Sequence, residues 1–136
     1  MAESADRFNE GKPRMGLNPA EPLMEMAWVL TGGAVKYGDH NWRKGLSYTS
    51  VLDSMERHIA AFKKGQDNDE ESSYHHMAHV MCNAAFLIQY HVDGMGATFD
   101  DRYKAPVLPA PSPINPFKYT PGPVPPTLPG KQGDYV

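Results

Sequence analysis

Two histidines and an asparagine recur at helical spacing in the second half of the chain. His76, His79 and Asn83 stand at i, i+3 and i+7. On a helix, which turns about 100° per residue, they share a sector of roughly 60°. Polar groups beside an apolar core cost on the order of 1–3 kcal/mol each unless they are paired. The pairing is either hydrogen bonding between helices or a functional site, and two histidines in one row favour the site.

An earlier segment carries a matching pair of acids. Asp53 and Glu56 stand at i and i+3 on the same predicted helix, so they lie on one face. Each also has a structural interpretation. Asp53 is an acid near the first turn, where it favours the helix dipole, and Glu56 is a surface acid within reach of Arg57 or Lys63.

Between these segments, residues 67–71 hold four carboxylates in five positions. Such a loop repels itself unless solvent or a cation screens it. Hard oxygen ligands beside a pair of helices suit Mg²⁺ or Mn²⁺, which bridge substrate phosphates. The predicted metal ligands are Asp53, Glu56, Asp67, Asp69, Glu71, His76 and His79. The predicted catalytic base is Glu56, Glu71 or His79, which the sequence does not rank.

Cations and an aromatic loop supply the rest of a nucleotide site. Arginine and lysine side chains bind phosphate oxygens, and the predicted contacts are Lys12, Arg14, Lys36, Arg43 and Arg57. In the glycine-rich connection that follows Lys36, Trp42 offers a flat face to a nucleobase and Asn41 a donor and an acceptor to its edge. The alternative is that Trp42 anchors the loop by packing on the first helix.

Three predicted helices position these residues. Asn18-Pro19 is a helix start, and apolar spacing continues to Lys36. The second helix begins near Thr49 or Ser50 and stops at Gly65. The third runs from about 74 to 91 behind a serine cap at 72 or 73. Its predicted core stripe comprises Met77, Val80, Met81, Ala84, Leu87 and Ile88.

Three helices with short loops and no alternating strand pattern predict an all-α antiparallel bundle. The core is small, so we expect oligomerisation, as a dimer or tetramer, to complete it. Residues 1–104 form the predicted helical domain. Ten of the 13 prolines lie between 106 and 129, which predicts an extended proline-rich tail over 105–136.

Composition narrows the classes of function. The net charge of −3 argues against coating a nucleic acid polymer. The single cysteine, Cys82, excludes an intrachain disulfide and fits a reducing cytoplasm. No apolar run predicts a membrane span, and the first residues lack the pattern of a signal segment. We therefore expect a cytoplasmic protein, in the host cytoplasm if a phage encodes it.

Several motifs in fixed order carry a family resemblance. They are Lys12-Pro13-Arg14, the run from Ala34 to Gly45 (AVKYGDHNWRKG), Arg57-His58, the run from Gly65 to Ser72 (GQDNDEES) and His76-Met77-Ala78-His79. Together with Gly94-Met95-Gly96 and Asp100-Asp101-Arg102, they span residues 12 to about 102. In this region the sequence resembles the phage and bacterial dATP/dGTP diphosphohydrolases, which are related to MazG-like all-α nucleoside triphosphate pyrophosphohydrolases.

The resemblance implies a Mg²⁺- or Mn²⁺-dependent enzyme that converts a purine deoxynucleoside triphosphate, dGTP or dATP, to the monophosphate and pyrophosphate. The MazG-like group carries two acidic pairs on successive helices. Here Asp53-Ser54-Met55-Glu56 matches the first pair, whereas His76 and His79 stand where the second pair is expected. Two alternatives remain. One is an HD-type triphosphohydrolase, which needs a helical His-Asp pair, and the other is a helical nucleotide- or metal-binding module without enzymatic activity.

Overall fold

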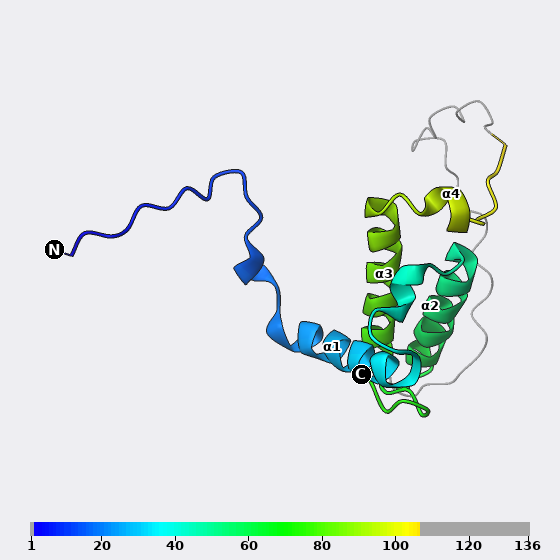
Figure 1. Ribbon diagram of the computed structural model, residues 1–136. Helices are drawn as coiled ribbons and strands as arrows, with labels where there is room; N and C mark the ends of the chain where they lie inside the picture. The colour runs from blue at the N-terminus through cyan, green and yellow to red at the C-terminus, as the bar shows by residue number, and fades with distance from the viewer. Residues whose placement is uncertain (1, 107–136) are drawn as a thin grey trace, which may run out of the picture. The chain divides into compact units, whose positions relative to one another are not determined.

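The computed structural model describes residues 2–106 of the 136-residue chain. In this range the elements are all helical, which confirms the predicted class, and they are drawn in Figure 1. Asn68 and His75 form one isolated bridge. The helices are α1 (Ala20–Tyr37), α2 (Tyr48–Lys63), α3 (His76–Val92) and α4 (Gly96–Phe99), with two short 3₁₀ helices, η1 (Met15–Leu17) and η2 (Asn41–Lys44).

Helix α1 begins at Ala20, one residue later than a cap at Asn18 would place it. The residue at its N-cap is Pro19, in an extended conformation and without a side-chain hydrogen bond, so the predicted capping role of Asn18 is wrong. The helix packs on α3. The thiol of Cys82 donates a hydrogen bond to the carbonyl oxygen of Met26 at 3.5 Å. A Cβ atom added to Gly32 would come within 2.9 Å of the Tyr74 ring. Glycine at this position therefore permits the close approach.

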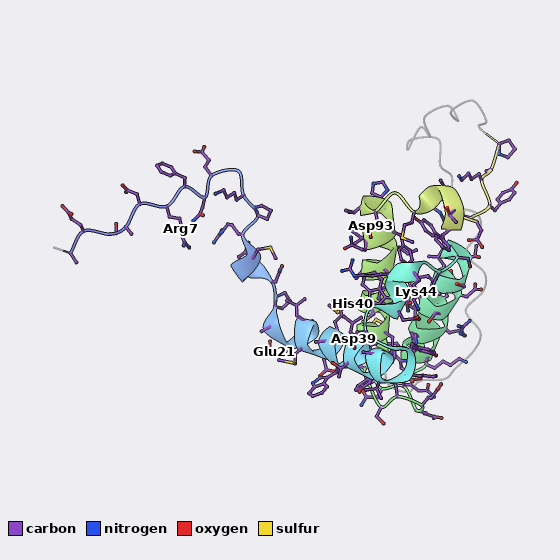
Figure 2. All side chains as sticks on the ribbon, in the orientation of Figure 1. Arg7, Glu21, Asp39, His40, Lys44 and Asp93 are labelled. Atoms are coloured by element: carbon purple, nitrogen blue, oxygen red, sulfur yellow. The ribbon has the colours of Figure 1, made fainter. Side chains whose placement is uncertain are left out.

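The connection from α1 to α2 contains η2. Asp39, His40 and Lys44 lie in it, as Figure 2 shows. His40 is the N-cap of η2 and has a left-handed backbone, with φ of 58°. The Asp39-His40 pair thus lies in a turn and not on a helix, which removes the geometry that an HD-type site needs.

Helix α2 begins at Tyr48, slightly before the predicted start. Its cap is Ser47, whose side chain accepts a hydrogen bond from the Ser50 amide. A second support comes from far along the chain, because the carboxylate of Asp101 accepts from the Thr49 amide at 2.9 Å and from its hydroxyl at 2.6 Å. Asp53 is the sixth residue of α2 and lies beyond its first turn, so the interpretation of Asp53 as an acid that favours the helix dipole there is wrong.

Helix α3 begins at His76 and not at Tyr74. Its cap is His75, whose Nδ1 accepts from the Met77 amide at 3.0 Å, so neither Ser72 nor Ser73 has the predicted capping role. Helices α2 and α3 lie side by side and antiparallel (Figure 1). The end of α2 therefore meets the beginning of α3, next to the acidic loop.

The buried core centres on Tyr48, Val51 and Tyr90, with Trp42 and Phe86 packed against it. The buried positions of α3 are His76, Ala78, Cys82 and Tyr90. The predicted core stripe is displaced from them: its members are only partly buried, and Ile88 is 67% exposed. The polar row that begins at His76 faces α2, and the stripe lies beside it at more exposed positions.

Contacts divide the chain after Tyr103. The prediction of an extended proline-rich tail concerns residues 105–136, nearly all of which lie outside the described residues. Among the described residues no helix combines the length and the apolar character required to cross a bilayer.

Candidate functional site

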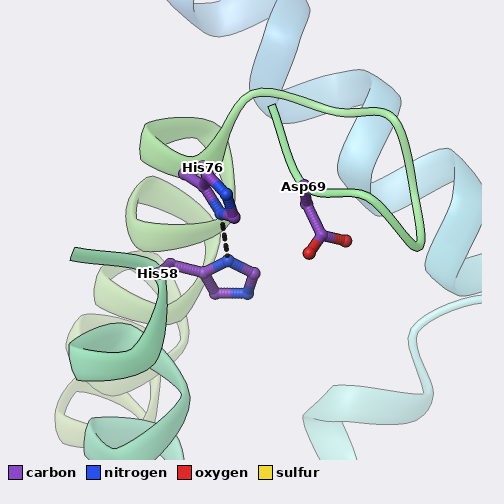
Figure 3. Close-up of side chains that lie close together, drawn as sticks. All are labelled: His58, Asp69 and His76. Carbon is purple, nitrogen blue, oxygen red and sulfur yellow. Dashed lines mark hydrogen bonds between the residues drawn. The ribbon is translucent and has the colours of Figure 1, made fainter. Parts of the chain in front are cut away.

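The polar row of α3 is paired along its length with α2 and the acidic loop. Asn83 donates to the Ser54 hydroxyl at 3.3 Å and to the His79 carbonyl at 3.0 Å. His76 pairs with a third histidine, His58 of α2, whose Nδ1 lies 2.9 Å from the Nδ1 of His76 (Figure 3). The expectation that these polar groups need partners is thus met, and the partners lie on α2 and in the loop.

A third imidazole completes the cluster. The rings of His58 and His79 are parallel within 3°, with centroids 4.3 Å apart, and the centroids of His58 and His76 are 5.2 Å apart. The Nε2 of His79 lies 2.8 Å from the hydroxyl of Ser72 in the loop. The three rings come from two helices and meet where α2 ends and α3 begins.

Asp69 brings a carboxylate to the same place. Its backbone is held by its amide, which donates to the Tyr74 carbonyl at 2.8 Å, and by its carbonyl, which accepts from Ser73 at 2.8 Å. Its side chain accepts from the Ser72 amide at 2.9 Å. One ligand atom from each of His58, Asp69 and His76 lies within 4.8 Å of the others, and Figure 3 shows the carboxylate beside the two rings.

His76 is the most enclosed member. It is 4% exposed, and its Nε2 is buried without a hydrogen-bond partner among the described residues. Leaving a buried nitrogen unpaired costs about 1–3 kcal/mol. In native proteins such atoms call for an explanation, and a bound ion or water is a common one.

The protonation states suit metal binding. Burial, followed by the nearby His79, lowers the pKa of His58, and burial also lowers the pKa of His79. Burial raises the pKa of Asp69, but hydrogen bonds from Ser72 outweigh it and leave that pKa below its usual value. Neutral imidazoles and an ionised carboxylate are the forms that coordinate cations. This donor set therefore fits a divalent metal ion.

Two predicted ligands lie elsewhere. Asp53 and Glu56 are exposed. Glu56 is two residues from His58, which places the two side chains about 200° apart around α2. Asp53 is five residues away, or about 140° around the helix. Within one chain, the α2 acid pair and the histidines therefore face different ways. Neither acid is in the group of ligand atoms around His58, so their role as metal ligands stays a prediction.

The acidic loop contributes Asp69 and not its other acids. Asp67 is exposed, and its carbonyl accepts from the His76 amide at 2.8 Å. Glu71 has a side chain 85% exposed and lies 3.7 Å from the ammonium of Lys36. Neither belongs to the group of ligand atoms around His58, although the charge of Glu71 acts on the pKa of His79.

The predicted phosphate contacts separate into two sets. Lys36 contacts the acidic loop through Glu71, and Arg57 directly precedes His58 on α2, so these two cations adjoin the elements that carry the cluster. Arg43 instead lies over the Trp42 ring, 4.6 Å from its centroid. Lys12 and Arg14 line a separate hollow of about 600 Å³ in the N-terminal segment.

The aromatic loop is a packing element. Trp42 stacks on Phe86 with ring centroids 4.4 Å apart, and its carbonyl accepts from the Tyr90 hydroxyl at 2.6 Å. It anchors the loop on α3 and not on α1 as the alternative interpretation had it. Asn41 beside it is half-buried. Base binding on Trp42 would compete with this packing.

Sequence reasoning did not assign His58 a role. A signal for it was present, because His58 interrupts the apolar positions Met55, Ile59 and Phe62 of α2. The argument that identified His76 as a polar residue bordering the core applies equally to His58.

Comparison with known proteins shows to which family the sequence belongs. Residues 2–102 match the family model described as dATP/dGTP diphosphohydrolase, N-terminal. The chain belongs to this family. The match includes every residue of the histidine cluster and the loop that carries Asp69.

A diphosphohydrolase relative from Salmonella phage PMBT28 is named dATP/dGTP diphosphohydrolase. It is 36% identical over 81 residues, which are 60% of this chain and 28% of the relative. The chain therefore matches little more than a quarter of that protein. No solved structure significantly matches this chain.

Proposed function

We propose that the chain hydrolyses purine deoxynucleoside triphosphates, dGTP or dATP, to the monophosphate and pyrophosphate in a reaction that needs a divalent metal ion. The observation that carries the proposal is the cluster of three imidazoles and the Asp69 carboxylate at the junction of α2 and α3. The family, named for this activity, supports the substrate class. The name of the relative supports it as well.

His58, Asp69 and His76 would hold the ion, for which Mg²⁺ and Mn²⁺ were the expectations from sequence. A bound divalent ion lowers the pKa of water and offsets negative charge on the phosphates. Lys36 and Arg57 border the cluster and bind phosphate oxygens at its rim. The carboxylate of Asp69 stays ionised because Ser72 hydrogen-bonds to it.

In this reaction, a water oxygen bonds to the α-phosphorus, the bond from the α-phosphorus to the bridging oxygen breaks, and pyrophosphate leaves. The water must lose a proton. Of the three predicted bases, His79 best fits this role. Its lowered pKa keeps it neutral at pH 7, and the Ser72 hydroxyl, 2.8 Å from Nε2, holds its ring. Glu56 faces away from the cluster, and Glu71 is engaged at the surface with Lys36.

We also propose that the chain works as a homo-oligomer. Apolar side chains of α2 and α3, among them Ile59, Phe62 and Ile88, remain exposed. A second copy that covers this surface would enlarge the core.

The test is a product assay. The chain is incubated with dGTP, dATP, dCTP, dTTP and the purine ribonucleotides, each with Mg²⁺ or Mn²⁺, and the products are separated by chromatography. Purine monophosphate with pyrophosphate supports the proposal. Nucleoside with triphosphate would indicate an HD-type reaction. No turnover with either ion would indicate a binding module.

Substitution of two of the three predicted bases, His79 and Glu56, tests their ranking. His79→Gln retains a polar side chain for Ser72 but loses the titratable ring, and we expect kcat to fall about 10²–10⁴-fold. Glu56→Gln and the exposed control His40→Asn are expected to stay close to wild type. Asparagine tolerates the left-handed backbone at position 40. A larger loss in Glu56→Gln than in His79→Gln would contradict the assignment.

A further inference from the structure

The ligands at the junction of α2 and α3 are two imidazoles and one carboxylate, a set that differs from the all-oxygen shell of a typical magnesium site. We propose that His58, Asp69 and His76 bind one transition-metal ion of the Mn²⁺, Co²⁺ or Zn²⁺ class in preference to Mg²⁺. The part of the inference that concerns the role of this ion in hydrolysis rests on the proposed function. The binding itself rests on the geometry alone.

Donor chemistry is the first argument. Mg²⁺ is a hard cation that prefers oxygen and gives up its water reluctantly, so proteins hold it by carboxylates and substrate phosphates. Imidazole nitrogen favours first-row transition metals and zinc. Two of the three ligands here are imidazoles, and the acids that would have built an oxygen shell, Asp53 and Glu56, face away from them.

The spacing of the nitrogens is the second argument. The Nδ1 atoms of His58 and His76 are 2.9 Å apart. Two nitrogens bound to one ion at about 2.0–2.1 Å lie roughly 2.9–3.4 Å apart, from adjacent octahedral to tetrahedral positions. The observed separation is within this range, so the nitrogens are close enough to share one ion once the rings turn from each other toward it.

The internal pairing of the rings is the third argument. Without an ion, one Nδ1 donates to the other, and either tautomer leaves the buried Nε2 of His76 without a partner. Charging both rings would bring like charges together at this distance. As a purely structural pair, the rings are limited to one shared proton between their Nδ1 atoms, whereas a cation bound by both nitrogens accepts both rings in the neutral form. The Nε2 of His76 stays unpaired in either case and does not decide between them.

The charge that results is the fourth argument. A divalent ion with one carboxylate and two imidazole ligands has a net charge of about +1, while the other loop acids, Asp67, Glu70 and Glu71, offset the charges of Lys36 and Arg57 around it. A shell of three or four carboxylates would instead give the site a net negative charge. The imidazole ligands thus leave a centre that attracts a triphosphate.

The experiment uses the full chain, stripped of metal by a chelator. Co²⁺ is titrated and followed by its visible absorption bands, and Mn²⁺ and Mg²⁺ binding are measured by calorimetry. We expect one Co²⁺ per chain, and an affinity for Mg²⁺ weaker on the order of 100-fold. His58→Ala is expected to lower Co²⁺ affinity at least about tenfold, whereas the control His40→Asn leaves it unchanged. Circular dichroism checks that each variant keeps its helices.

X-ray absorption of the Co²⁺-loaded wild-type chain gives a second measurement that needs no variant, and scattering from two imidazoles is expected. Absence of Co²⁺ binding, equal affinity for Mg²⁺, unchanged binding in folded His58→Ala or a shell without imidazole would each overturn the inference. Its failure is distinct from failure of the proposed function. Hydrolysis supported by Mg²⁺ without Co²⁺ binding sinks only the ion assignment, and Co²⁺ binding without hydrolysis sinks only the enzyme.

Discussion

At the scale of single residues, Asp101 shows how a distant side chain defines a helix start. Its carboxylate accepts from both the amide and the hydroxyl of Thr49, in the first turn of α2. An anion at a helix N-terminus is favourable because unpaired amides and the helix dipole meet there. The hydrogen bond from the Thr49 side chain, followed by the one from its amide, lowers the pKa of Asp101. The residue fastens the segment after α4 to the start of the helix that carries His58.

This link predicts a pH-dependent stability difference. A carboxyl group whose pKa is lowered by folding stabilises the fold fully above its unfolded value, about 3.8. The contribution is lost as pH falls through the lower, folded pKa. Asp101→Asn is therefore expected to melt below wild type at pH 7, and the two melting temperatures should converge as pH falls below 3.8. Thermal unfolding from pH 7 to pH 2.5 measures this difference.

Asp39→Asn is the matched control, because Asp39 is an exposed acid in the connection between α1 and α2. It should melt close to wild type across the whole range. A constant gap between wild type and Asp101→Asn down to the lowest pH would mean that the side chain acts by shape and not by charge.

At the scale of elements, the connection between α1 and α2 is held by two glycines with different surroundings. Gly38 and Gly45 both have positive φ, 92° and 101°. A Cβ on Gly38 would meet open space, whereas one on Gly45 would overlap the ring of Phe99 in α4. Gly45 therefore combines a backbone requirement with a close approach between η2 and α4, and Gly38 has the backbone requirement alone.

Alanine at each position separates these two effects. Gly38→Ala is expected to lower the free energy of unfolding by about 1 kcal/mol through backbone strain. Gly45→Ala should cost at least about 1–3 kcal/mol more, because Phe99 must leave its place against Tyr48 and Tyr90. Urea denaturation followed by circular dichroism measures both. Equal losses would show that the Phe99 contact contributes little.

The helices themselves were predictable, because their apolar spacing and the lack of strand patterns depend on local sequence. The first residues of the helices were less predictable than the helices themselves. A histidine cap at His75 competes with Ser72 and Ser73, which are engaged in the turn around Asp69. The buried face of α3 was also misplaced. Helical periodicity indicates that an apolar face exists, but it does not show that the face toward α2 carries polar residues, which pair there with Ser54 and His58.

The same limit applies to the site. Spacing alone was enough to indicate that His76 and His79 share a helix face with Asn83. Which acid joins them depends on the turn formed by the Asp69 backbone with Ser73 and Tyr74, and single-residue patterns do not encode that turn. The two acids of α2 matched a motif by spacing, although helical geometry places them across α2 from His58.

At the scale of the whole molecule, the core is small for the length of the helices. The buried hydrophobic side chains among the described residues are Tyr48, Val51, Ala78, Cys82 and Tyr90. Larger apolar side chains remain on the outside. Leu52, Leu87 and Ile88 line a hollow of about 620 Å³, together with residues of α4 and of the segment after it, among them Asp100 and Arg102, and Ile88 is 67% exposed. A surface of this kind favours a protein interface.

We expect a second copy to cover this hollow, since a stable interface buries roughly 1,200–2,000 Å² in total and two such helix pairs can pack as a four-helix layer. Sedimentation equilibrium at micromolar concentration should give a multiple of the 15.1 kDa chain mass. Ile88→Asp buries a charge in the interface and should shift the chain toward the monomer. Val35→Asp, at an 87% exposed position of α1, should leave the mass unchanged. A wild-type monomer would contradict the expected self-association, and dissociation by Val35→Asp alone would move the interface to α1.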